Sequence, residues 1–198
     1  QRQGLLMALG KIETSVKRAS RITHQLLGHV KKQGPRFACV DMTLLVLETL
    51  ALLKGEIKHK QVNIHWKTPQ KEFMLISDAY QIRQVLVNLV SNAIHALHPN
   101  GTISLSIHET PVFTVFGIED DGVGILPANL GKIFDPFFTT KSFDQGTGLG
   151  LFVVHKIISG LGGEIDVESQ PGRGTGFIIK LPRNLDKELS DLKDTIQK

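Results

Sequence analysis

Hydrophobic residues in the first 34 positions form one stripe, with spacings that alternate between four and three residues. The stripe consists of Leu5, Leu9, Ile12, Val16, Ala19, the pair Ile22/Thr23, Leu26 and Val30. This heptad spacing is typical of a helix that packs along another helix. A single helix of this kind is marginal alone, so we expect a partner helix from a second copy of the chain or from an upstream segment. Gly34 and Pro35 predict its end, and we expect a hinge over residues 35–40.

From residue 41 to residue 184 the periodicity alternates between helical and strand-like stretches, which indicates one domain of mixed elements. Helices are expected from Asp41 to about Leu53 with a stop at Gly55, from Asp78 to about Leu97, and over 149–161. Strands are expected over 61–68, 73–76, 102–109, 112–119, 164–169 and 174–181. This order predicts an α+β fold, a two-layer α/β sandwich with helices on one face of a mixed sheet. The tail, 185–198, resumes heptad spacing and is expected to form a linker helix.

The net charge of +4 changes this picture little once it is located. Eight of the 23 Lys and Arg residues but one of the 19 acidic residues lie in the first 38 positions, so the main domain is mildly acidic. Charge of one sign along a helix is usually a solvated face, which argues against a nucleic-acid partner. Cys39 is the single cysteine, so we expect no disulfide framework. No apolar run reaches the roughly 18 residues that span a bilayer. We expect a cytoplasmic domain, with any membrane anchor of the full-length protein upstream.

Asn88 and Asn92 are candidate metal ligands. The predicted helix over 78–97 places them four residues apart and therefore on one face. Neutral carboxamide oxygens suit a Mg²⁺ ion that also binds phosphate oxygens and water. Taken alone, such a pair is more often simply exposed on a helix.

Two glycine motifs border a long irregular segment, residues 120–147. Residues 120–125 (DDGVGI) follow a strand, and their Gly-x-Gly leaves room for a flat ligand close to the backbone. Asp120, at the end of the strand, could accept a hydrogen bond from an amine such as that of adenine. Residues 146–151 (GTGLGL) open a helix, whose N–H groups and dipole favour an anion. Between them, residues 132–141 (KIFDPFFTTK) contain three Phe that we expect to fix the segment to the domain, and Lys141, a candidate phosphate contact. Each motif alone also fits a plain turn or loop.

In this order, and with GRGTG at 172–176, the motifs resemble the N, first glycine, F, second glycine and third glycine boxes of sensor histidine kinases, over about residues 40–183. The stretch FDPFFTTK…GTGLGL is similar to the nitrogen-regulation type of kinase. The wider GHKL superfamily, which includes gyrase, Hsp90 and MutL, shares the Bergerat ATP-binding fold. The resemblance implies a protein histidine kinase that uses ATP and Mg²⁺. It also implies a homodimer through the heptad helix and a response regulator as partner.

By this resemblance Asn88 and Asn92 coordinate Mg²⁺, Asp120 binds the adenine amine, and Asn88 and Lys141 serve catalysis. The resemblance places further residues around the nucleotide: His95, Gly122, Gly124, Ile125, Phe138, Thr139, Gly146, Thr147, Gly148, Leu149, Gly150, Leu151 and Thr175. Two positions depart from the family pattern. His95 stands where many members have Lys, which weakens the expectation of a phosphate contact there. Gln84 stands where a Glu often precedes the first Asn, which disfavours water activation of the gyrase type.

We do not expect the histidine that accepts the phosphoryl group within this chain. His24 lies on the N-terminal helix, but no acid is adjacent to it and no Pro follows. Residues 18–27 instead resemble the second helix of a dimerisation hairpin, so residues 1–34 are expected to be that helix and the acceptor to lie upstream of Gln1. His29 has the same weakness as His24. Residues 41–184 are then the catalytic and ATP-binding domain.

Three other functions share such a pocket. A GHKL ATPase that gates dimerisation is disfavoured by Gln84 and by a heptad helix placed before the domain. An anti-sigma Ser/Thr kinase would need no helical hairpin segment upstream. A degenerate module that binds nucleotide only as a scaffold is disfavoured because all the motifs are intact.

Overall fold

The computed structural model describes residues 36–66, 73–141 and 146–183. The predicted heptad helix over 1–34 and the predicted tail helix over 185–198 lie outside the described residues. None of the helices in the described ranges has the combined length and hydrophobicity that crossing a bilayer requires.

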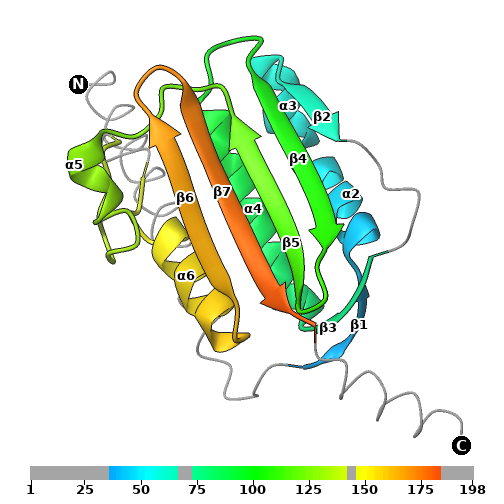
Figure 1. Ribbon diagram of the computed structural model, residues 1–198. Coiled ribbons are helices and arrows are strands. Elements are labelled where there is room, and N and C mark those ends of the chain that lie inside the picture. The colour runs from blue at the N-terminus through cyan, green and yellow to red at the C-terminus, as the bar shows by residue number, and fades with distance from the viewer. Residues whose placement is uncertain (1–35, 67–72, 142–145, 184–198) are drawn as a thin grey trace, which may run out of the picture.

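A five-stranded mixed sheet forms one layer of the domain, with strand order β2-β4-β5-β7-β6 (Figure 1). Its strands are β2 (Asn63–Trp66), β4 (Thr102–Glu109), β5 (Phe113–Asp120), β6 (Glu164–Gln170) and β7 (Gly174–Pro182). β2 pairs parallel to β4, and the other neighbours pair antiparallel. A separate two-stranded sheet joins β1 (Ala38–Asp41) to β3 (Met74–Ser77). The predicted mixed sheet is confirmed.

Three helices cover one face of the large sheet: α2 (Met42–Leu52), α4 (Ala79–Ala96) and α6 (Gly150–Gly160) (Figure 1). As predicted, Asp41 and Asp78 cap α2 and α4. The Asp78 carboxylate accepts hydrogen bonds from the N–H groups of Tyr80 and Gln81, at 2.9 and 3.1 Å. Each cap of this kind contributes about 1 kcal/mol to stability. The two-layer sandwich expected from the sequence is therefore the observed fold.

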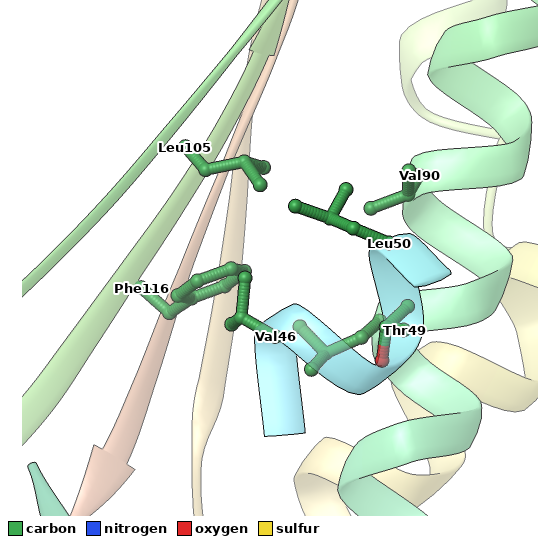
Figure 2. A pocket seen from close by; sticks show the side chains of 7 residues that line it. Val46, Thr49, Leu50, Val90, Leu105 and Phe116 are labelled. Carbon is green, nitrogen blue, oxygen red and sulfur yellow. The ribbon is translucent and has the colours of Figure 1, made fainter. Parts of the chain in front are cut away.

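The hydrophobic core lies between the sheet and these helices. On α4 the side chains at helical spacing are buried, from Ile82 to Ile94, and Leu89 has no exposed surface. Side chains of α2 meet those of α4 and the sheet at Val46, Thr49, Leu50, Val90, Leu105 and Phe116 (Figure 2). The space among them has no room for a water molecule, so this contact is packed core. Full burial of one such side chain contributes about 1.5–3 kcal/mol.

Residues 38–40, the last part of the expected hinge, form strand β1 together with Asp41 and pair with β3. One local prediction is wrong. Gly55 does not end the helical path, because a second helix, α3 (Lys54–Lys60), begins after a turn at Leu53. Ile57 packs against the core and holds α3 in place. The helical path ends instead at Gln61, which has the left-handed φ of 56°.

Candidate functional site

A cavity of about 650 Å³ lies between α4, the end of β5, the N-terminus of α6 and the short helix α5 (Pro127–Leu130). Its size is within the roughly 300–1,000 Å³ of small-molecule sites. The predicted site residues that line it are Asn88, Asn92, His95, Asp120, Gly124, Ile125, Phe138, Thr139, Lys141, Gly146, Thr147, Gly148, Gly150, Leu151 and Thr175. Gly122 and Leu149 do not line it. Leu149 is 1% exposed and belongs to the core.

One end of the cavity is built on paired strand ends. Asp120 is the last residue of β5 and lies opposite Thr175 of β7. Gly122 contributes here through its backbone, because its N–H donates to Asp120 Oδ1 at 2.9 Å. Burial raises the pKa of the Asp120 carboxyl above its ordinary value, against the opposing effect of hydrogen bonds from the Gly122 and Thr175 backbones. This end therefore presents a partly desolvated carboxylate that is held in a fixed orientation.

Two glycines of the cavity wall occupy positions that exclude a side chain. Gly124 has a φ of 68°, and an added Cβ would overlap the carbonyl of Gln170. Gly148 has a φ of 67°, and an added Cβ would overlap the backbone of Phe137. Left-handed φ values of this kind are routine only for glycine. One glycine in each motif is thus required by the close approach of backbone from outside the motif, at residue 170 for Gly124 and at residue 137 for Gly148.

The other end of the cavity gathers amide oxygens and cations along α4. Asn88 Nδ2 donates to the Gln84 carbonyl at 2.9 Å, so its Oδ1 remains available to the cavity. Lys141 Nζ donates to Asn92 Oδ1 at 3.4 Å. Burial, followed by the nearby charge of Lys60, lowers the pKa of Lys141 below its ordinary value. This end can therefore hold an anion together with a cation that takes neutral oxygen ligands.

His95 lines the same end of the cavity. Its Nδ1 lies 2.6 Å from the Ser91 carbonyl oxygen, which can only accept, so Nδ1 carries a proton. Lys60 Nζ donates to the His95 carbonyl oxygen at 3.0 Å and to that of Ile94 at 2.8 Å, which anchors the end of α4 to α3.

Comparison with known proteins identifies the family. Residues 77–185 match the family described as histidine kinase-, DNA gyrase B-, and HSP90-like ATPase. The chain belongs to this family. The resemblance to histidine kinases expected from the sequence is confirmed.

The curated relatives are longer than the chain. It is 34% identical over 171 residues to sensor histidine kinase ZraS of Escherichia coli (strain K12), which covers 86% of this chain and 36% of ZraS. It is 35% identical over 195 residues to sensor kinase CckA of Brucella abortus (strain 2308), with 91% of this chain and 20% of CckA covered. The chain thus spans about a third or less of the length of these two relatives.

Solved structures agree with the fold of the chain. The catalytic domain of histidine kinase ThkA has a TM-score of 0.68 and 34% identity, and the match covers 75% of this chain and 96% of that domain. ThkA in complex with response regulator protein TrrA has a TM-score of 0.73 and 27% identity, covering 89% of this chain and 50% of ThkA. The Bergerat fold expected from the sequence is therefore confirmed.

Several residues that line the cavity were not expected from the sequence. They are Glu56, Ser91, Ala93, Ala96, Val123, Leu126, Asn129, Ile133, Thr140 and Phe177. Ser91 could have been found, because it lies three residues after Asn88 and four before His95, on one helical face. Glu56 of α3 and Asn129 of α5 had no local signal, since tertiary packing alone brings those two helices to the cavity.

Proposed function

We propose that this chain is the ATP-binding catalytic region of a two-component sensor histidine kinase. It transfers the γ-phosphoryl group of ATP to a histidine on a dimerisation hairpin, for relay to an aspartate of a response regulator. One observation carries the proposal: a single cavity has a half-buried carboxylate, Asp120, at one end, and two amide oxygens with an ammonium group at the other. A nucleotide presents an amine on its base at one end and a charged triphosphate at the other, and the two ends of the cavity match these groups. The family to which the chain belongs is one of ATPases.

The base end would recognise adenine through Asp120. Its carboxylate accepts from an exocyclic amine, and the glycine at 124 allows the flat ring to approach the backbone. Thr175 lies beside it on β7 and is 6% exposed. We assign the remaining predicted lining residues to the nucleotide contact surface.

The triphosphate end would hold Mg²⁺ through Asn88 and Asn92. The residues fit this ion. The Asn88 amide N–H donates to the Gln84 carbonyl, so the Asn88 side-chain oxygen is available as a ligand. Asn92 also presents a side-chain oxygen, which accepts a hydrogen bond from Lys141. Mg²⁺ would neutralise charge on the β- and γ-phosphates. Lys141 and the N–H groups at the start of α6 would bind phosphate oxygens. Catalysis at this end is then orientation and charge stabilisation rather than covalent chemistry by the domain.

The partner helices and the acceptor complete the proposal. Residues 1–34 would form the second helix of the dimerisation hairpin and pair in a homodimer, residues 35–40 would lead into the domain, and 41–184 would bind nucleotide. The similar kinase ThkA has been solved with the response regulator TrrA, which supports a receiver domain as the downstream partner. The acceptor histidine would lie outside this chain.

The test mixes the full chain with Mg-[γ-³²P]ATP and a separately expressed dimerisation hairpin that bears the acceptor histidine. We expect acid-labile label on the hairpin and none on the chain. An Asn92→Ala variant should abolish the label, whereas Ser106→Ala, on an exposed strand position, should not change it. Label on the chain that disappears with His24→Ala would overturn the placement of the acceptor. ATP hydrolysis without any labelled histidine would overturn the kinase assignment in favour of a gyrase-type ATPase.

A further inference from the structure

Ser169, near the end of β6, connects three segments around the base end of the cavity, although it does not line the cavity itself. Its Oγ accepts a hydrogen bond from the Ile125 N–H at 2.8 Å. The same hydroxyl donates to the Gly174 carbonyl at 2.9 Å and lies 3.0 Å from Thr175 Oγ1. Neither the sequence motifs nor the proposed function assigns Ser169 a role.

Counting donors fixes the direction of the bond between the two hydroxyls. A serine hydroxyl has one proton to donate and two lone pairs to accept. The Gly174 carbonyl can only accept, so the single Ser169 proton is committed to it. The Ile125 N–H fills one lone pair of Ser169. The remaining bond must therefore run from the Thr175 hydroxyl to the second lone pair of Ser169, which leaves both hydroxyls without a free proton.

The consequence for Thr175 is that its hydroxyl can only accept on the side that faces the cavity. Thr175 is 6% exposed and pairs directly with Asp120 across β5 and β7, so the two groups share one wall. The Asp120 carboxylate is also an acceptor while it is ionised. Two adjacent acceptors favour a donor on the ligand and disfavour a carbonyl, because a buried acceptor that faces another acceptor loses its hydrogen bond.

We propose that Ser169 is a positioning residue that fixes the Thr175 hydroxyl as an acceptor and thereby sets the preference of the pocket for an amino over a keto purine nucleotide. The inference rests on the proposed function, because it needs the base at this end of the cavity. Ser169 touches no substrate atom. It acts by holding the proton of Thr175 away from the cavity.

The test compares two nucleotides that differ at C6, ATP with its amine and ITP with its carbonyl. Dissociation constants for both are measured by calorimetry on the full chain and on three variants: Ser169→Ala, Ser169→Thr and Ser106→Ala. In Ser169→Ala the Thr175 hydroxyl loses its acceptor and can turn its proton toward a carbonyl. We expect the ratio of the ITP to the ATP dissociation constant to fall by about three- to ten-fold, the effect of one hydrogen bond.

Ser169→Thr keeps the hydroxyl and should restore the wild-type ratio, and Ser106→Ala should leave the ratio unchanged. A purely structural role for Ser169 predicts that Ser169→Ala weakens both nucleotides by the same factor. A ratio within two-fold of wild type would therefore overturn the proposal. If Ser169→Ala does not fold, Ser169→Cys replaces it, because its thiol fills similar space but is only a weak donor and acceptor. The ratio of the ITP to the ATP dissociation constant of that variant is then judged by the same two-fold limit. Failure of the wild-type chain to bind ATP would instead refute the proposed function.

Discussion

Asp120→Asn should lower the affinity for ATP without lowering the stability of the fold, because the carboxylate binds the base but is itself costly to bury. The substitution keeps an oxygen that can accept from the Gly122 N–H, now 2.9 Å from Oδ1, so the local backbone has no reason to move. It also replaces an acceptor by an amide NH₂ group, which faces the donor amine of adenine with another donor. A hydrogen bond to a charged group contributes about 1.5–3 kcal/mol, so ATP affinity should fall by about 10- to 150-fold.

The same variant should be at least as stable as wild type at neutral pH. The pKa of Asp120 is raised mainly by burial, so the folded state binds this proton more readily than the unfolded state. The free energy of unfolding therefore decreases as pH rises from the ordinary aspartate value through the raised one, and the burial cost is fully present above both. Asparagine carries no charge and removes that cost. The advantage of the variant should disappear below about pH 4, where both states of the wild type are protonated.

Calorimetry with ATP at pH 7.5 gives the affinity, and urea unfolding at pH 7.5 and in acid gives the stability. Asp121→Asn is the matched control. Its carboxylate is exposed and accepts from the Thr102 N–H at 2.8 Å, outside the cavity, so ATP affinity should stay within two-fold. An Asp120→Asn protein with wild-type affinity would show that the base does not bind at this end. Reduced stability together with reduced affinity would show that Asp120 is a structural residue.

Two further predictions concern the lining of the cavity. Gly148→Ala places a Cβ at a φ of 67° against the backbone of residue 137, so it should cost at least about 1–2 kcal/mol of unfolding free energy in urea and weaken ATP binding. Gly131 has open space around it, so Gly131→Ala should lower the unfolding free energy by less than half as much. Equal losses of stability in the two variants would refute the close approach of Gly148 to the backbone of residue 137. Lys141 has a pKa lowered by burial and then by Lys60, so ATP affinity should decline with rising pH before an ordinary lysine titrates. Lys60→Met removes the nearby charge, so the decline in ATP affinity, measured by calorimetry across pH, should shift to higher pH. An unchanged midpoint of that decline would contradict the influence of Lys60 on Lys141.

Features of the fold that depend on local chemistry were predictable from the sequence. Asp41 and Asp78 precede helices and cap them through bonds two and three residues away, a pattern that needs no tertiary knowledge. The alternation in residues 102–109 located a strand to the residue. The order of the nucleotide motifs located most of the cavity wall, because those motifs lie at the ends of these elements.

Features that depend on distant partners were not predictable in this way. Residues 38–41 became a strand only because β3, more than 30 residues later, offers them a pairing edge. Gly55 is tolerated in α3 because Ile57 packs against the core, and tertiary packing exceeds the cost of one helical glycine, about 1 kcal/mol. Ser169 was missed because its hydrogen bond from the Ile125 N–H, which joins β6 to the first glycine motif, spans 44 positions.

The two ends of the cavity rest on different parts of the fold, and this predicts that their variants separate in assays. The base end is attached to β5, β6 and β7, whose backbones are paired along their whole length. Changes at Asp120 or Ser169 should therefore alter nucleotide affinity and base preference while the transfer rate at saturating ATP stays close to wild type. The phosphate end depends on the side chains of Asn88, Asn92 and Lys141, which orient the γ-phosphate toward a nucleophile supplied from elsewhere. Changes there should lower the transfer rate even at saturating ATP, because binding energy from the base end cannot replace alignment at the reacting atom.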